Sequence, residues 1–190
     1  SNMHVGLALA GAEQKSAWFD FMAQAHPFAS MTLNTDAYGA CIGAHNGQDG
    51  AIMIGGTGSC GIYLNNGEQH VVGGREFPIS DQGGGAVMGL RLIQQVLLAE
   101  DGIRSKTPLT QHVMNHFNND VDAIVAWSKG AIPKDYGQFS PVIFQLANEG
   151  DELAIEMLKQ TAADIEMFVL ALHRKGADKV CLMGSIAERI

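Results

Sequence analysis

The sequence is short of several features that mark whole classes of protein. It has only 12 Lys and Arg residues against 20 Asp and Glu residues, with no basic cluster, and its net charge is −8. Because a nucleic-acid surface needs concentrated positive charge to neutralise phosphates, this balance argues against a nucleic-acid partner. No apolar run approaches the roughly 20 residues that a membrane-spanning helix requires, so no membrane partner is expected either.

Cysteine is also scarce. Cys41, Cys60 and Cys181 are odd in number, widely spaced and never part of a CxxC pair. Such a set favours neither a disulfide framework nor a zinc site, and it suits a cytoplasmic protein. His112 and His116 stand four residues apart, the spacing of two metal ligands on a helix. No Glu follows His112 and no third ligand is evident, so we predict a solvated helix face there and name no metal ligand.

What the sequence has in quantity is glycine. More than half of its 23 glycines lie in residues 47–89. Within that stretch, residues 51–54 and 61–64 read as two strands joined by Gly55-Gly56-Thr57-Gly58-Ser59, and Asn66-Gly67 is typical of a hairpin turn into a third strand at 68–72. The first turn can direct several backbone N–H groups and two hydroxyls at one anion. A strand after Ser59 rules out a hydrolase elbow, and no Lys follows to make a Walker A loop.

The remaining elements follow from hydrophobic periodicity. Continuous apolar runs at 4–10, 51–54 and 179–183 predict buried strands, and 30–33 predicts another short strand. Polar residues at helix starts and glycine or proline at helix ends delimit the helical segments. We expect helices over 13–26, 36–43, 84–99, 108–117, 120–129, 134–148 and 151–175. The glycine-rich polar connector at 43–50 indicates a hinge, which predicts domains at 4–48 and 49–190.

Four short motifs, taken in order, resemble a known family. They are Asn34-Thr35-Asp36-Ala37, Gly55-Gly56-Thr57-Gly58-Ser59, the segment from Gly73-Gly74 to Asp81-Gln82-Gly83, and Cys181-Leu182-Met183-Gly184-Ser185. Each is weak alone, but their order and spacing are specific and span nearly the whole chain. The chain resembles the BadF/BadG/BcrA/BcrD-type ATPases, within the actin, heat-shock chaperone and hexokinase superfamily. Its nearest likeness is to the sugar-kinase branch, which includes glucosamine and N-acetylglucosamine kinases.

The resemblance implies an α/β fold of the ribonuclease H-like, actin/hexokinase type with two domains. The family's first phosphate loop and its closing strand and helix are not found in this sequence. We therefore interpret the chain as a fragment, with 4–48 as the rear of the N-terminal, sugar-side domain and 49–190 as most of the nucleotide-binding domain. Such a fragment is expected to have little or no kinase activity alone. An open sheet edge would also favour self-association, for example as a homodimer.

The resemblance also implies roles for individual residues, with ATP and Mg²⁺ as cofactors. Asp36 would be the catalytic base on the sugar's 6-hydroxyl, although position alone suits a helix cap equally. The nucleotide would be held by Gly56, Thr57, Gly58, Ser59, Gly184 and Ser185. The sugar would be held by Thr35, Gly74, Arg75, Glu76 and Asp81.

One departure from the family bears on the substrate. N-acetylglucosamine kinases of the family tend to carry Gly-Trp-Gly where this chain has Gly74-Arg75-Glu76. The change removes a surface suited to an acetyl methyl, and Glu76 near Asp81 could pair with the ammonium of glucosamine. An Arg75–Glu76 ion pair is the open alternative. The expected function is ATP-dependent phosphorylation of glucosamine at the 6-hydroxyl. N-acetylglucosamine kinase, a regulatory ATPase and a catalytically dead sugar-binding domain are the alternatives.

Overall fold

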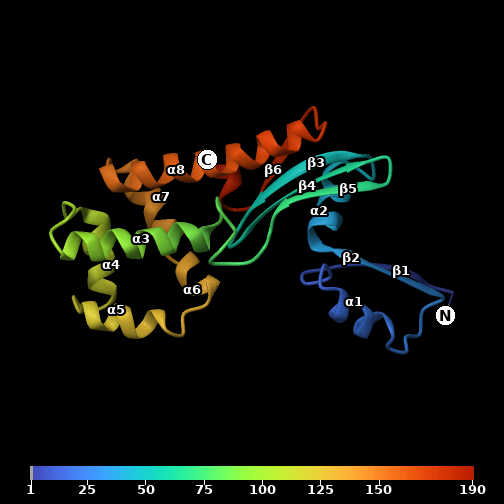
Figure 1. Cartoon of the computed structure of the whole chain (residues 1–190), viewed down its shortest axis with the longest axis horizontal. Coiled ribbons are helices and arrows are strands. Elements are labelled where there is room, and N and C mark those ends of the chain that lie inside the picture. Colours follow the sequence, from blue (N-terminus) through green and yellow to red (C-terminus); the bar gives the residue numbers. More distant parts are fainter. Residues whose placement is uncertain (1) are drawn as a thin grey trace.

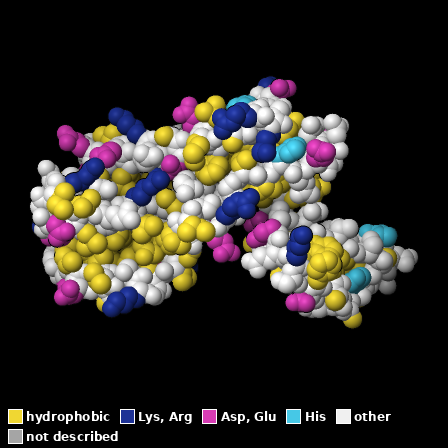
Figure 2. All heavy atoms as spheres, viewed as in Figure 1, with side chains coloured by type: hydrophobic (Ala, Val, Ile, Leu, Met, Phe, Trp, Pro, Cys, Tyr) yellow, Lys and Arg dark blue, Asp and Glu magenta, His cyan; other side chains and the backbone are white. Residues whose placement is uncertain are grey.

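The computed structural model describes residues 2–190, and its N-terminal end forms a small β-α-β unit (Figure 1). This N-terminal unit consists of β1 (His4–Leu9), α1 (Lys15–Met22) and β2 (Ser30–Thr35). β1 and β2 pair in parallel along their whole length. The Trp18 indole N–H donates to the Leu33 carbonyl at 3.1 Å and ties α1 to β2. Leu33 is the one buried residue in these three elements. In the space-filling view the unit projects from the rest of the molecule (Figure 2).

The helix α2 (Asp36–Ala44) follows β2 without a loop. The Thr35 hydroxyl oxygen caps it by accepting the Tyr38 N–H at 3.1 Å, which satisfies one of the free donors of the first turn. Ala37 and Cys41 are buried against the sheet formed by the next strands. Because α2 contacts both this sheet and the N-terminal unit, the division into domains at residue 48 stays a prediction.

A four-stranded sheet forms the centre of the molecule. Its strands are β3 (Gly50–Gly55), β4 (Ser59–Asn65), β5 (Glu68–Gly73) and β6 (Val180–Met183), in the order β5-β4-β3-β6. The first three are antiparallel and β6 runs parallel to β3. The turn between β4 and β5 has positive φ at Asn66 (50°) and Gly67 (83°), which confirms the predicted two-residue hairpin.

Helices cover both faces of this sheet, because alternate residues of its strands point to opposite sides. Ile52, Ile62 and Leu64 pack with α2 on one face, whereas Ala51 packs with Leu172 of α8 (Glu152–Arg174) on the other. α8 runs along the sheet, and the remaining helices gather at its far end (Figure 1). They are α3 (Gly85–Glu100), α4 (Pro108–His116), α5 (Val121–Ser128), α6 (Pro133–Gly137) and α7 (Ser140–Asn148), and a short 3₁₀ turn, η1 (Ala187–Arg189), follows β6. None of the helices in residues 2–190 is long and apolar enough to cross a bilayer.

The structure confirms most predicted elements and corrects three. β1 and β6 are strands, but both are largely exposed, so the prediction that they are buried is wrong. Each pairs with only one strand within the described chain, and an apolar run reports strand propensity but not what covers it. The single helix expected over 134–148 is two helices, α6 and α7. Pro141 lies in the first turn of α7, where a missing N–H is tolerated, and it would interrupt a continuous helix.

Candidate active-site cleft

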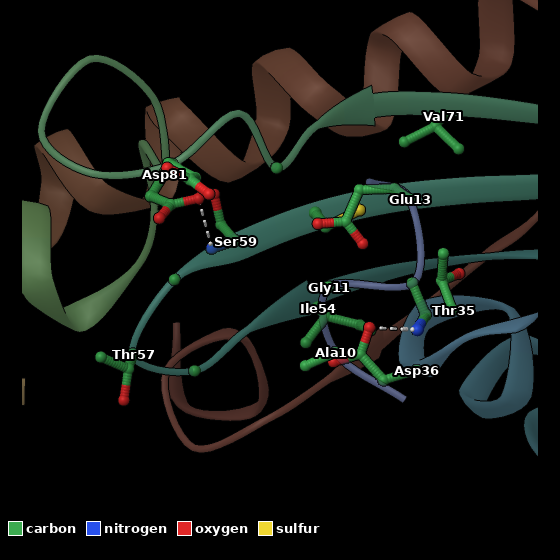
Figure 3. Close-up of a pocket in the computed structure, with 16 residues that line it drawn as sticks. Ala10, Gly11, Glu13, Thr35, Asp36, Ile54, Thr57, Ser59, Val71 and Asp81 are labelled. Atoms are coloured by element: carbon green, nitrogen blue, oxygen red, sulfur yellow. Dashed lines mark hydrogen bonds between the residues drawn. The ribbon is translucent and has the colours of Figure 1, made fainter. Parts of the chain in front are cut away.

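A cavity of about 370 Å³ lies between the N-terminal unit and the four-stranded sheet. Its walls come from the loop after β1, the junction of β2 and α2, the turn between β3 and β4, and the loop after β5 (Figure 3). Segments that are far apart in sequence therefore meet at one place. The volume is in the range of about 300–1,000 Å³ that holds a small molecule.

Asp36 stands on one side of this cavity as the first residue of α2. Its Oδ1 accepts the N–H of Ala37 at 2.8 Å, whereas Oδ2 has no hydrogen-bond partner within residues 2–190 (Figure 3). The helix cap is Thr35, so Asp36 is not needed for capping. The buried contacts of α2 with the sheet fix where Asp36 stands. The result is an exposed carboxylate with one free oxygen at a fixed place in the cleft.

The β3–β4 turn (residues 56–58) lines another part of the same cavity. The Gly56 N–H donates to the Gly58 carbonyl at 3.0 Å, which closes the turn. The carbonyls of Gly56 and Thr57 accept N–H groups from the start of α3 at 2.8 and 2.9 Å. A Cβ on Gly84 would lie 2.7 Å from the Gly58 carbonyl carbon, so only glycine allows α3 to approach this closely. The turn is thus held rigidly by the helix behind it.

The turn presents free backbone donors. The N–H groups of Thr57 and Gly58 have no acceptor within the described chain. Ser59, next along, is committed elsewhere: its hydroxyl donates to the Gln82 carbonyl at 2.6 Å and its N–H donates to Asp81 Oδ1 at 3.3 Å. Of the two hydroxyls expected to face an anion, only that of Thr57 is exposed and free to do so. Two free N–H groups and one hydroxyl remain to bind an anion.

The loop after β5 adds two carboxylates. Glu76 and Asp81 both line the cavity, and both have positive φ, 70° and 69°. Positive φ is uncommon for residues other than glycine and costs free energy. Arg75 does not line the cavity, and within residues 2–190 it forms no ion pair with Glu76. The Glu76 carboxylate is therefore not neutralised by its neighbour.

The cavity is electronegative. Four carboxylates line it, those of Glu13, Asp36, Glu76 and Asp81, and the lining contains no Lys, Arg or His. Burial, followed by the negative charges of Asp36, Asp81 and Glu13 in that order, raises the pKa of the Cys60 thiol to about 11. Three carboxylates therefore act on one point of the cavity. Such a field attracts cations, although no three acidic, His or Cys side chains within residues 2–190 converge closely enough to form a ready metal site.

The cavity brings together most of the sequence-predicted site residues but not all. Gly184 and Ser185 lie outside it, behind the base of the β3–β4 turn. The Gly184 N–H donates to Glu188 Oε1 at 2.9 Å, and a Cβ on Gly184 would lie 2.6 Å from the Gly55 carbonyl oxygen. The predicted residues that line the cavity are Thr35, Asp36, Gly56, Thr57, Gly58, Ser59, Gly74, Glu76 and Asp81. Those that do not are Arg75, Gly184 and Ser185.

Sequence reasoning missed Glu13 and Cys60. Glu13 lies in the loop after β1, and Asp36 lies directly after β2, its parallel neighbour. The carboxyl ends of parallel strands meet at one edge of a sheet, which is where ligands bind in such folds. Pairing the two predicted strands in parallel would therefore have placed Glu13 beside Asp36. Cys60 has no such signal, because its place in the cavity depends on how the sheet meets the N-terminal unit, which no local pattern reports.

Comparison with known proteins gives a consistent set of relatives. The family profile of the BadF/BadG/BcrA/BcrD ATPases matches residues 2–190. The chain is 78% identical over 189 residues to a Vibrio cholerae protein named glucosamine kinase GspK, and 27% identical over 157 residues to an N-acetyl-D-glucosamine kinase of Dictyostelium discoideum. The predicted family is confirmed. The match to the Vibrio protein covers 100% of this chain and 64% of that protein, and the match to the Dictyostelium protein covers 79% of this chain and 49% of that protein.

Solved structures give the same fold. A Chromobacterium violaceum protein provisionally named N-acetylglucosamine kinase superposes with a TM-score of 0.90 at 33% identity, covering 98% of this chain and 65% of its own. A Porphyromonas gingivalis structure matches with a TM-score of 0.72 at 21% identity, again over 98% and 65%, and shows the fold alone. The predicted α/β fold of sugar-kinase type is confirmed. The chain spans less than two thirds of the length of these relatives, in agreement with the interpretation as a fragment.

Proposed function

Because the chain belongs to the BadF/BadG/BcrA/BcrD ATPase family, we propose that it forms the reaction cleft of a kinase that transfers a phosphoryl group from ATP to the 6-hydroxyl of glucosamine. One observation carries the proposal. Asp36, which has a free carboxylate oxygen, and Thr57 and Gly58, which have free N–H groups, line the same cavity. A sugar bound between them would lie with its hydroxyl at the base and facing the phosphates.

The chemistry asks for little more than this arrangement. Phosphoryl transfer depends on positioning and on charge stabilisation, with a carboxylate that accepts the proton of the attacking hydroxyl. Asp36 would accept that proton on Oδ2. The Thr57 and Gly58 N–H groups, with the Thr57 hydroxyl, would donate to phosphate oxygens. Because α3 fixes the turn from behind, these donors need no reorganisation during the reaction.

Mg²⁺ is part of the proposal, and the residues present fit it. Mg²⁺ prefers oxygen ligands and is usually bound through one or two carboxylates plus substrate phosphates, not by a protein cage. The cavity offers acidic side chains near the β3–β4 turn without converging them into such a cage. When bound with the nucleotide, the ion would neutralise phosphate charge. We expect its contact here to be with phosphate oxygens first.

Glu76 favours glucosamine over its N-acetyl derivative. It has a positive φ of 70°, where glycine costs least, so a carboxylate at this place is held against local strain. Since Arg75 does not neutralise it, the carboxylate can pair with the ammonium of an unacetylated amino sugar. N-acetylglucosamine is the second candidate, because it is the sugar in the names of the Dictyostelium and Chromobacterium proteins.

The test uses a full-length chimera, in which residues 2–190 replace the matching segment of the Vibrio glucosamine kinase. A coupled ADP-release assay compares glucosamine with N-acetylglucosamine. We expect turnover with glucosamine, and a fall in kcat of at least about 100-fold in Asp36→Asn because general base catalysis is lost. Asp20→Asn, the same change on the exposed side of α1, is the control and should be silent. Unimpaired turnover by Asp36→Asn would remove the proposed base.

Two further measurements test the choice of sugar and the activity of the 190-residue chain alone. Glu76→Gln in the chimera should raise the KM for glucosamine about tenfold and leave that for N-acetylglucosamine unchanged. An equal effect on both sugars would contradict ammonium pairing. The 190-residue chain alone is expected to show little or no turnover.

We also infer a cytoplasmic protein, because its cysteines are all free. We further infer a homodimer formed through the open edges of β1 and β2.

A further inference from the structure

The Asp81 carboxylate lies in the cavity and contacts the β3–β4 turn. Its Oδ1 accepts the Ser59 N–H at 3.3 Å (Figure 3). Its carboxyl group also packs on Gly58, the residue before Ser59: a Cβ on Gly58 would lie 2.9 Å from Asp81 Oδ2 and 3.1 Å from Cγ. The carboxylate therefore lies against the backbone of Gly58 and Ser59, next to the two free N–H groups of the turn. It takes the third N–H in that row.

This contact competes with a nucleotide. The Ser59 N–H that Asp81 holds is the natural continuation of the Thr57 and Gly58 donors, so a phosphate bound across all three would need it. Two negative groups at one N–H also repel each other, and the repulsion is strong where water is partly excluded. No Lys, Arg or His side chain lines the cavity to offset this repulsion. A phosphate can use the full row of donors only after the Asp81 carboxylate has turned away.

The loop that carries Asp81 is built to let the side chain turn while its backbone stays. The Asp81 carbonyl accepts the Gly84 N–H at 2.9 Å, and the Glu76 carbonyl accepts the Ser80 N–H at 2.9 Å. These bonds hold the loop at both ends and do not involve the carboxylate. The positive φ of Asp81 aims its side chain at the turn in spite of local strain. A new partner in the cavity would only have to offer the carboxylate a better hydrogen bond than one at 3.3 Å.

We propose that Asp81 holds the β3–β4 turn closed to nucleotide phosphates until a sugar hydroxyl takes over its carboxylate. The inference rests on the proposed function, because it needs an amino sugar in the same cavity. Glucosamine would bring both a cation for Glu76 and hydroxyl donors for Asp81 to this loop. Sugar binding would then free the Ser59 N–H and draw negative charge away from the turn. Asp81 is thus a positioning residue that makes sugar and nucleotide binding mutually supportive and discourages transfer of the phosphoryl group to water.

The experiment measures binding of a non-hydrolysable ATP analogue with Mg²⁺ to the full-length chimera by calorimetry, with and without saturating glucosamine. The unmodified chimera should bind the analogue about tenfold more tightly with the sugar, a coupling of ordinary size. Without sugar, Asp81→Asn should bind it several-fold more tightly than the unmodified chimera, because the charge is gone although an acceptor for Ser59 remains. Asp81→Ala should bind it more tightly still, because the Ser59 N–H is also released. Asp178→Asn, an exposed position after α8, is the matched control.

The direction of the change separates this role from a structural one. A residue that merely supports the turn would weaken nucleotide binding when removed, and weaker binding by both variants would overturn the proposal. So would equal nucleotide affinity with and without glucosamine in the unmodified chimera, a readout that requires no variant to fold. In those cases the proposed kinase would stand. Failure of the analogue to bind under any condition would overturn both the gating role and the proposed function.

Discussion

The two walls of the cleft differ in how they are built. The N-terminal unit has a single buried side chain, that of Leu33, and α1 has none. The sheet–helix body (β3 to β6 with α3 to α8) has a large core in which Met53 and Leu92 are fully buried, and Ile52 on the other face of the sheet is fully buried against α2. Phe19 of α1 is 65% exposed, whereas Trp127 of the body makes tilted and edge-to-face ring contacts with the buried Tyr136 and Phe139. One wall is therefore firmly packed and the other is held mainly by its attachment.

Because of this difference, some parts of the site are held in place by the body and others by the N-terminal unit. The turn, the Glu76–Asp81 loop and Asp36 all depend on the body, since α2 packs its Ala37 and Cys41 on the sheet. Glu13 depends on the N-terminal unit alone. Regions with little buried apolar contact open locally at low free energy, and elements that move on ligand binding are drawn from them. We expect the Glu13 wall to open and close around a substrate while the rest of the site stays in place.

The largest expected effect is on amide hydrogen exchange. Amides of β1, α1 and β2 should exchange at least about 100-fold faster than those in the middle of α3 and α8, because local opening precedes global unfolding only where packing is light. Exchange of the isolated chain, followed by mass spectrometry of its peptic fragments, measures this directly. Equal protection of the two regions would show that the unit unfolds only together with the body.

The same substitution in each region should separate them next. Gly89 of α3 lies against the backbone carbonyl of Tyr136 in α6, so the Cβ of Gly89→Ala would force these two packed helices apart. We expect a loss of about 3 kcal/mol or more in the free energy of unfolding. In Gly6→Ala of β1 the new Cβ would lie 3.6 Å from Thr32 Oγ1, an ordinary contact, and the change should stay within about 0.5 kcal/mol. Urea unfolding of both variants tests the pair, and similar losses would erase the contrast.

Helix capping gives a smaller version of the same contrast. Asp151 is buried and accepts two N–H groups, that of Ala154 in α8 and that of Leu109 in α4, each at 2.9 Å. Asp151→Ala should therefore lose about 2 kcal/mol of unfolding free energy. Thr35→Ala at the head of α2 loses one such bond and should cost about 1 kcal/mol. Asp120→Ala, an exposed single cap of α5, is the control that should resemble Thr35→Ala.

The sequence predicts locally determined elements better than it predicts burial, for a physical reason. Strong local signals define the β4–β5 hairpin through Asn66-Gly67 and the helix over 151–175, which the structure places at Glu152–Arg174. These depend on backbone conformation and periodicity, which neighbouring residues determine. Burial of β1 and β6 was predicted wrongly because it depends on which elements lie above them.

The same distinction applies to the site. Asp36 and the β3–β4 turn could be predicted because each sits at a local motif, a helix start and a glycine turn. That the Ser59 hydroxyl is bonded to Gln82 depends on a contact between residues 23 positions apart, and no local pattern reports it. The roles of these residues in catalysis and binding stay predictions until the variants are measured.

The smallest expected effect uses Cys60 as a probe of how closely the two walls meet. Its thiol lines the cavity, and burial, then Asp36, Asp81 and Glu13, raise its pKa to about 11. Because only the thiolate is nucleophilic, Cys60 should be alkylated slowly at pH 8, and the rate should rise about tenfold per pH unit up to about 11. Removing a nearby negative charge lowers the pKa, increases the thiolate fraction and speeds alkylation.

How much each substitution speeds labelling of Cys60 distinguishes the wall formed by the body from the wall formed by the N-terminal unit. In a Cys181→Ser background, which removes the exposed thiol, Asp36→Asn should speed iodoacetamide labelling of Cys60 a few-fold because α2 keeps that carboxylate against the sheet. Glu13→Gln should have a smaller effect, since its charge contributes least of the three carboxylates and we expect its loop to open away from β4. Asp20→Asn should change nothing. Equal acceleration by Asp36→Asn and Glu13→Gln would mean that the N-terminal unit is held as firmly as the body, because a wall that opens cannot impose its full charge on Cys60.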